Sequence, residues 1–131
     1  MTKKEFKPFI IAVYGSLRRD FGNHRILKDS EYLGEFKTKE LFDLYSLGAY
    51  PFISERGDTE ITVELYKVIC PIIAQNLDRL EGYPSFYNRK VIEIKDFTSE
   101  LKTYIYYIID KHSYINNNKI NSGDWKLFKN K

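Results

Sequence analysis

A short polar loop directly after an apolar run is the first place where this chain could bind a ligand. The run Phe9–Tyr14 ends at Gly15, and the sequence continues Ser16-Leu17-Arg18. A glycine after a strand lets the backbone turn sharply, and successive N–H groups in such a loop can converge on an anion. The loop therefore indicates a carboxylate site, although an ordinary strand-ending turn would contain the same residues.

Glu81 is the residue that best fits acid–base chemistry. It lies at the carboxyl end of a predicted helix, where the helix dipole disfavours its anion, and Tyr83, Phe86 and Tyr87 follow it. Partial burial among these rings would disfavour the anion further, so both effects raise the pKa of the carboxyl group from about 4.3 toward neutrality. A carboxyl group with a near-neutral pKa can shuttle protons. A solvated glutamate at a helix end is the alternative.

The other reactive side chains offer no second centre. Ser16 does not have glycines at the G-x-S-x-G spacing of a nucleophile elbow. No GK[ST] follows it either, as would be expected in a phosphate-binding loop. His24 and His112 have no cysteine or carboxylate at ligand spacing, so we predict no metal site. Cys70 lies within an apolar run and is expected to be a buried, unreactive thiol. The pair Arg18-Arg19 is expected to lie on a solvated loop.

A buried strand and a helix must hold these candidates in place. The run Phe9–Tyr14 lacks polar alternation, which is typical of a strand buried on both faces. Pro71 suits the first turn of a helix, apolar residues follow at helical spacing, and Gly82 suits the left-handed position after the last turn. These signals predict a helix over Pro71–Leu80, with Glu81 at its end.

Shorter stretches complete the predicted fold. Glu60–Ile69 alternates apolar and polar residues, which predicts a strand. The other expected elements are a loop over 15–23, a helical turn at His24–Leu27, one or two strands within Tyr32–Leu47, a short strand or turn at Tyr50–Ser54, a turn at Arg56–Asp58, strands at Phe86–Lys95 and Leu101–Ile109, a turn at Ile115–Asn118, and a packing anchor at Trp125. About six strands and one main helix indicate an α+β fold with a small curved or closed sheet.

The composition is that of a single globular domain. The chain has 131 residues, of which 43% are hydrophobic and 30% charged, and its net charge is +3. These values argue against disorder and against a strongly basic nucleic-acid-binding protein. No apolar run reaches the length of a membrane-spanning helix, and one cysteine cannot form an internal disulfide. We expect one domain over 9–131 after a loose arm at 1–8, in a reduced, cytoplasmic setting.

Four short motifs resemble the γ-glutamylcyclotransferase-like proteins, and most closely the γ-glutamylamine cyclotransferase branch, also called AIG2-like. The motifs are Val13–Arg19 with Asn23-His24, Tyr50-Pro51, Leu77–Pro84 with Tyr87 and Arg89, and Ser122-Gly123-Asp124-Trp125. They follow the family order across residues 13–125. One departure is Ser16, where this branch more often has threonine, and a loop that binds through its backbone tolerates that change.

The resemblance implies a small mixed β-barrel with helices outside it and a cavity at one mouth. It also implies a reaction in which a γ-glutamyl compound cyclises to 5-oxoproline and releases an amine, with no metal or organic cofactor. The backbone amides that bind the glutamyl α-carboxylate in this family correspond to those of Tyr14, Gly15, Ser16 and Leu17. The acid–base residue corresponds to Glu81, and Tyr87 corresponds to a residue that lines the pocket. The implied partner is a small molecule rather than nucleic acid or a membrane.

Two other functions are compatible with the same residues. A barrel of this kind could hold a carboxylate ligand without turning it over. Tyrosine-rich strands beside basic residues also occur in small barrels that bind single-stranded nucleic acid. The low net charge counts against the second alternative.

Overall fold

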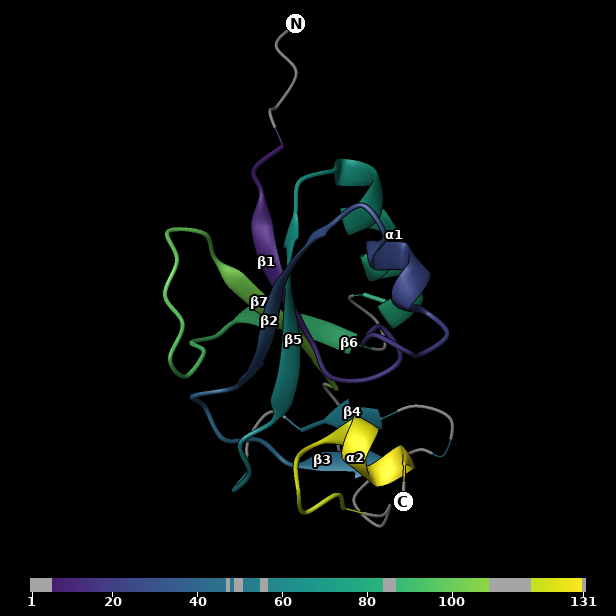
Figure 1. Ribbon diagram of the computed structural model, residues 1–131, viewed down its shortest axis with the longest axis vertical. Helices are drawn as coiled ribbons and strands as arrows, with labels where there is room; N and C mark the ends of the chain where they lie inside the picture. Colours follow the sequence, from purple (N-terminus) through teal and green to yellow (C-terminus); the bar gives the residue numbers. More distant parts are fainter. Residues whose placement is uncertain are drawn as a thin grey trace, which may run out of the picture.

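The computed structural model describes residues 6–46, 48, 51–54, 57–83, 87–108 and 119–130. Its main element is a five-stranded mixed sheet in the order β2-β5-β1-β7-β6, beside a two-stranded sheet of β3 and β4 (Figure 1). In chain order the elements are β1 (Phe9–Val13), the 3₁₀ helix η1 (His24–Leu27), β2 (Glu31–Lys37), β3 (Leu44–Ser46), β4 (Pro51–Ile53), β5 (Thr62–Val68), α1 (Pro71–Glu81), β6 (Tyr87–Val91), β7 (Thr103–Ile108) and α2 (Trp125–Lys129). β1 runs parallel to β7, and the other paired strands are antiparallel.

β1 is the central strand and is covered on both faces. Ile10 and Ala12 pack into one hydrophobic cluster, whereas Ile11 and Val13 pack into another. All four side chains are buried. The continuous apolar run therefore predicted the position of this strand correctly, and the loop that follows it leaves from the middle of the sheet.

Helix α1 lies beside η1 and covers the second of these clusters (Figure 1). It begins at Pro71, as predicted, and ends one residue later than predicted, at Glu81. Gly82 has a φ of 64° and its N–H donates to the Arg79 carbonyl, which is the helix ending that the glycine indicated. Burial of Leu77 against the sheet fixes the helix, and its carboxyl end lies next to the loop after β1.

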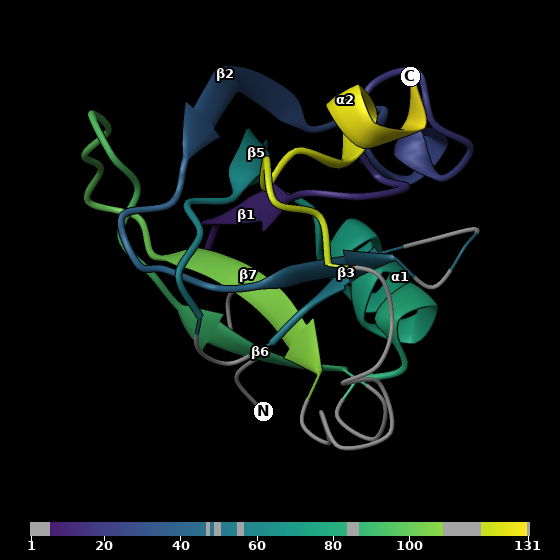
Figure 2. The ribbon, with the colours of Figure 1, turned by 90° about the horizontal axis from the view of Figure 1, so that it is seen from below.

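The α+β prediction is confirmed, but the described residues form no closed barrel. β2 and β6 are the outer strands of the sheet. Beyond them, Thr38 forms a bridge with Ile94, and the Lys95 N–H donates to the Lys37 carbonyl at 2.9 Å. Figure 2 shows the chain after β2 crossing the side of the sheet to reach this point. A few bridging hydrogen bonds therefore join the two edges at one end without a continuous ladder.

Strand β5 confirms the strand predicted over Glu60–Ile69, and two of its polar residues are also buried. Glu64 is 2% exposed and Thr62 is 5% exposed. β5 pairs with β1 along one edge and with β2 along the other. Its two faces are covered as well, because Val63 and Leu65 pack into one hydrophobic cluster and Tyr66 and Val68 into the other. The buried Glu64 carboxylate is paired with the Arg18 guanidinium at 3.0 Å.

The carboxyl-terminal segment forms a short helix that the sequence did not predict. Asp124 caps α2 by accepting a hydrogen bond from the Leu127 N–H at 3.1 Å. Trp125 is buried in the cluster on the first face of the sheet, which confirms its predicted role as a packing anchor. Among the described residues, neither α1 nor α2 has the length and apolar character that a bilayer-crossing helix needs.

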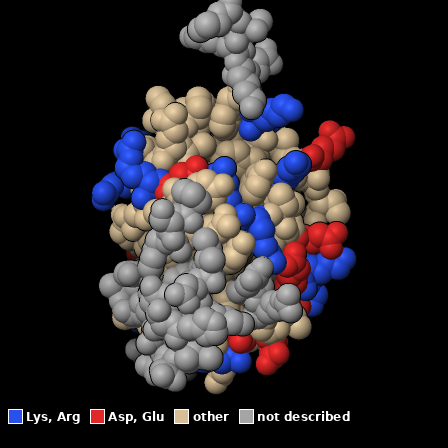
Figure 3. Space-filling view, turned by 180° about the vertical axis from the view of Figure 1, so that it is seen from behind, with Lys and Arg blue, Asp and Glu red and all other residues tan. Residues whose placement is uncertain are grey.

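Other expectations lie partly or wholly outside the described residues. β6 is shorter than the strand predicted over Phe86–Lys95. The predicted features at Tyr50, Arg56 and 115–118, and most of the arm at 1–8, lie outside the described residues. Figure 3 shows Lys and Arg side chains interspersed with Asp and Glu over the described part of one face.

Gly123→Ala is expected to destabilise the fold by roughly 2 kcal/mol or more, because it combines backbone strain with a steric clash. Gly123 has a φ of 70°, and a Cβ atom there would lie 2.1 Å from the Glu60 carbonyl oxygen. Urea unfolding measures the loss. Gly48→Ala is the matched control, since Gly48 has a φ of 96° but nothing within 4 Å of the added Cβ atom. Equal losses in the two variants would contradict the steric argument.

Candidate active site

A cavity of about 430 Å³ lies where the loop after β1 meets the carboxyl end of α1. Its lining residues are Tyr14, Gly15, Ser16, Leu17, Glu81 and Tyr87, together with Ala12, Val13, Asn23, Pro51, Leu80 and Tyr106. The first six are the site residues that the sequence predicted. The fold therefore brings two motifs that are far apart in the sequence together around one cavity. The volume of this cavity is typical of small-molecule sites.

The loop after β1 is held in place through its carbonyl groups. The Gly15 carbonyl accepts a hydrogen bond from the Arg18 N–H at 2.9 Å. The Ser16 carbonyl accepts one from the Asn23 N–H at 3.0 Å, and Asn23 Nδ2 donates to Ser16 Oγ at 2.9 Å. Within the described part of the chain, no hydrogen bond uses the N–H groups of residues 15–17. Successive unpaired amides in a cavity wall are suited to bind a carboxylate.

His24 holds the third carbonyl of this loop. Its Nδ1 lies 3.0 Å from the Leu17 carbonyl oxygen. Because a carbonyl only accepts hydrogen bonds, Nδ1 must carry a proton in this contact. The ring also packs against Tyr66, with 5.6 Å between the ring centroids. The sequence indicated no metal-binding role for His24, and the structure shows a half-buried side chain that contacts the loop after β1.

Glu81 lines the same cavity from the last turn of α1. Burial raises the pKa of its carboxyl group from 4.5 to about 7. The pKa of the Tyr14 phenol is raised well above its usual value, first by burial and then by the nearby Tyr87 and Glu81. Glu81 is therefore close enough to Tyr14 for their charges to interact, and it can hold or release a proton at neutral pH.

Glu81→Gln is expected to stabilise the protein above neutral pH. A carboxyl group with a folded-state pKa of about 7 binds its proton more tightly in the folded than in the unfolded chain. In the wild type, Glu81 therefore destabilises the folded state as the pH rises. This destabilisation is absent below pH 4.5, grows as the pH rises through 7, and reaches at most about 3 kcal/mol. Urea unfolding of both proteins at about pH 5 and about pH 8 measures the difference.

The exposed Glu100 provides the control for this comparison. Glu100→Gln is expected to leave the free energy of unfolding unchanged at both pH values, because a solvated carboxyl group loses little hydration on folding. If Glu81→Gln is no more stable than the wild type at the higher pH, the carboxyl group is not buried as described.

Tyrosine hydroxyls shape the cavity wall. Tyr14 Oη donates to the Tyr106 carbonyl at 2.8 Å, and Tyr87 Oη donates to the Pro51 carbonyl at 2.9 Å. Both bonds are buried and join β1 to β7 and β6 to β4, respectively. The hydrogen bond therefore fixes the orientation of the Tyr87 side chain, and Tyr87 lines the cavity.

A polar cluster that the sequence did not predict anchors the turn of α1 that carries Glu81. Asp78 accepts hydrogen bonds from Tyr106 Oη at 2.6 Å and from Arg89 Nη1 at 2.7 Å. The Arg89 guanidinium also lies over the Tyr83 ring, 4.3 Å from its centroid. Strands β6 and β7 thus fix the end of the helix, because each contributes one of the two donors to Asp78.

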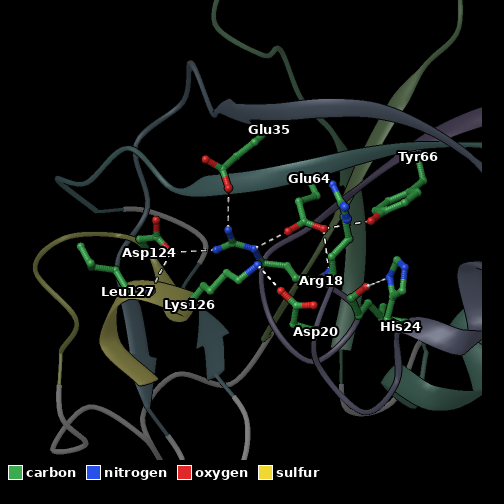
Figure 4. A network of polar contacts seen from close by, with 11 residues as sticks. Arg18, Asp20, His24, Glu35, Glu64, Tyr66, Asp124, Lys126 and Leu127 are labelled. Carbon is green, nitrogen blue, oxygen red and sulfur yellow. Dashed lines mark hydrogen bonds and ion pairs between the residues drawn. The ribbon is translucent and has the colours of Figure 1, made fainter. Parts of the chain in front are cut away.

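Arg18 is not on a solvated loop, which corrects the expectation from the sequence. Its side chain is 1% exposed, and the guanidinium lies within 2.8–3.0 Å of Glu35, Glu64 and Asp124 (Figure 4). A glutamate in the middle of the apolar run of β5 was the one signal in the sequence for a buried cation nearby. Arg19, in contrast, is exposed, as predicted.

Comparison with known protein families gives a consistent assignment. The family model "Gamma-glutamyl cyclotransferase, AIG2-like" matches residues 11–127. A gamma-glutamylcyclotransferase-family protein of Vibrio cholerae is 40% identical over 116 residues, which are 88% of this chain and 94% of the relative. A protein of the same family from Methanocaldococcus jannaschii is 33% identical over 122 residues, covering 91% and 97% of the two chains.

Solved structures show the same fold. An AIG2-like protein from Mus musculus superposes with a TM-score of 0.76 at 23% identity, covering 91% of this chain and 90% of the mouse chain. The protein ytfP from Escherichia coli superposes with a TM-score of 0.68 at 31% identity, covering 94% and 100% of the two chains. Because the family model spans most of the sequence and full-length relatives exceed 30% identity, the chain belongs to the AIG2-like gamma-glutamyl cyclotransferase family.

Proposed function

We propose that this protein is a γ-glutamyl cyclotransferase that acts on a γ-glutamyl amine or γ-glutamyl amino acid. The α-amine of the substrate attacks its own γ-carbonyl carbon, and the products are 5-oxoproline and a free amine. The observation that carries the proposal is a single cavity that contains unpaired loop amides and a carboxyl group with a pKa of about 7. Membership in the family supports this class of reaction.

The loop binds one end of the substrate. The α-carboxylate lies against the backbone at Tyr14–Leu17 and accepts hydrogen bonds from the unpaired amides of residues 15–17. Glu81 and Tyr87 line the same cavity. A substrate held at its carboxylate places its α-ammonium and γ-amide toward Glu81, and a folded conformation brings the two reacting atoms together.

Glu81 moves the protons. As a carboxylate it takes one proton from the α-ammonium, and the nitrogen lone pair then forms a bond to the γ-carbonyl carbon. Glu81 gives that proton to the departing nitrogen as the carbon–nitrogen bond of the amide breaks and the carbonyl reforms. The ring nitrogen then loses its extra proton through Glu81 to the released amine. Two protons therefore pass from the α-nitrogen to the leaving nitrogen, and the charges balance.

This mechanism needs no protein nucleophile. The substrate supplies the attacking nitrogen, so the Ser16 hydroxyl in the cavity wall has no covalent step to perform. Its Oγ instead accepts the hydrogen bond from Asn23 Nδ2. A binding protein without catalysis would need the amides but would gain nothing from a carboxyl group whose pKa is raised by burial.

A substrate panel tests the proposal. The purified protein is incubated with γ-glutamyl amines and γ-glutamyl amino acids, and 5-oxoproline is measured by chromatography. We expect release from at least one class, with kcat/KM rising with pH around a midpoint of about 7 as Glu81 becomes a carboxylate. Recovery of intact ligand from every mixture, with binding detected by calorimetry, would instead identify a binding protein.

A further inference from the structure

We propose that Arg18 is a positioning residue, which holds the loop at residues 15–17 in the shape that binds the substrate α-carboxylate. Arg18 is not among the residues that line the cavity, so it acts through the loop rather than by touching the substrate. The inference rests on the proposed function, because it assigns the carboxylate to these amides.

The Arg18 side chain is fixed at all three nitrogen atoms of its guanidinium group (Figure 4). Nε lies 3.0 Å from Glu64 Oε2, Nη1 lies 2.8 Å from Asp124 Oδ1, and Nη2 lies 2.8 Å from Glu35 Oε1. The side chains of these carboxylates are 3%, 22% and 55% exposed, respectively. A planar group with three partners in different directions cannot rotate without breaking a buried contact.

The backbone next to Arg18 is held by the same cluster. The Arg19 N–H donates to Glu64 Oε1 at 2.8 Å, and Tyr66 Oη donates to the same oxygen at 2.9 Å. The Arg18 N–H donates to the Gly15 carbonyl. The amides of residues 18 and 19 are therefore engaged within the protein, whereas those of residues 15–17 donate to none of the described residues. A shift of Arg18 would move the turn whose unpaired amides line the cavity.

The carboxyl-terminal helix completes this support. Asp124 pairs with Arg18 and also caps α2. Lys126 Nζ, in the same helix, lies 2.9 Å from Asp20 Oδ2, two residues after Arg18 in the chain. No residue of the motif Ser122–Trp125 lines the cavity, and the Asp124–Arg18 ion pair connects this motif to the loop after β1.

Arg18→Lys tests the inference because it keeps the charge but cannot contact three carboxylates in one plane. We expect KM for L-γ-glutamyl methylamide to rise about 10- to 100-fold, as when charge-assisted hydrogen bonds to an anion are weakened. The value of kcat and the pH midpoint of kcat should be unchanged, because Glu81 is untouched. Arg25→Lys, a change at an exposed arginine in η1, is the matched control.

A second ligand separates positioning from general stability. The analogue of the methylamide that lacks the α-carboxylate cannot use the loop amides. Wild-type protein should prefer the carboxylated compound, and Arg18→Lys should lose most of that preference. A purely structural role would lower the melting temperature but leave the preference the same, and that result would overturn the inference.

Calorimetry keeps the test independent of catalysis. Binding of both compounds is measured in the single variant Glu81→Gln and in the double variant Glu81→Gln/Arg18→Lys. Neither protein needs to react, because the preference for the carboxylated compound is measured as a difference in binding. If Arg18→Lys does not fold, Asp124→Asn replaces it, since asparagine still caps α2 while its ion pair is lost. Failure of the wild type to form 5-oxoproline contradicts the proposed function, whereas equal preferences in both backgrounds contradict the role of Arg18.

Discussion

Glu81→Gln is expected to lower kcat for 5-oxoproline release by roughly 100- to 10,000-fold, the range over which general acid–base groups act. Glutamine keeps the shape of the side chain in the cavity but can neither take a proton from the α-ammonium nor return it to the leaving amine. KM should change little, because the loop amides still bind the carboxylate. Initial rates on an accepted γ-glutamyl amide measure both constants.

The same substitution is expected to increase stability above neutral pH, as derived above, so a loss of activity cannot be attributed to unfolding. A protein that becomes more stable when a functional charged group is replaced has lower stability in exchange for its activity. Glu100→Gln should retain wild-type rates, since Glu100 is exposed and lies outside the cavity lining. Wild-type rates in Glu81→Gln would show that another group moves the protons.

Gly15→Ala is expected to lower kcat/KM by about 100-fold, as a displacement of about 1 Å in a positioning element can do. An added Cβ atom at Gly15 would lie 2.7 Å from Pro51 Cγ and 2.8 Å from Pro51 Cδ. Pro51 is buried in β4, and its carbonyl accepts a hydrogen bond from Tyr87 Oη, so the loop must move instead. The amides next to Gly15 would then leave the positions that bind the carboxylate.

Gly22→Ala is the matched control for this variant. Gly22 lies in the same loop, and nothing lies within 4 Å of a Cβ atom placed there. We expect its kinetic constants to equal those of the wild type. Calorimetric titration with 5-oxoproline adds a measure of carboxylate binding without turnover. Unchanged binding in Gly15→Ala would mean that the loop does not hold the carboxylate.

The sequence predicted the elements that depend on local signals. The apolar run before Gly15 identified β1, because a strand covered on both faces has no polar side. Pro71 and Gly82 identified the ends of α1, because each residue suits a backbone geometry specific to one end of a helix. Glu81 and the loop after β1 followed from those two elements, and both line the cavity.

Features that depend on distant partners could not be predicted in the same way. Arg18 pairs with Glu64, 46 residues away, and with Asp124, 106 residues away. When the order of strands in the sheet is not known, an arginine that follows a glycine-containing loop is most simply interpreted as a solvated residue. The buried polar face of β5 follows from the same pairs. The open edges of the sheet could not be predicted either, because closure depends on how the ends of β2 and β6 meet.

Helix α2 was missed because it is short. Five residues are too few for helical periodicity to be recognised, and its stability comes from the Asp124 cap and the burial of Trp125. The motif that contains these residues pointed to the family without indicating their structural purpose. The structure supplies a purpose, since Asp124 connects the end of the chain to the loop that lines the cavity.

The most direct test of the account follows the α-nitrogen through the reaction. Wild-type protein is incubated with a γ-glutamyl amide that carries a heavy nitrogen isotope in its α-amino group, and the products are analysed by mass spectrometry. Intramolecular attack predicts 5-oxoproline that contains the label, together with unlabelled amine. Labelled free glutamate would show that water, rather than the α-amine, attacks the γ-carbonyl, and this would contradict the proposed reaction.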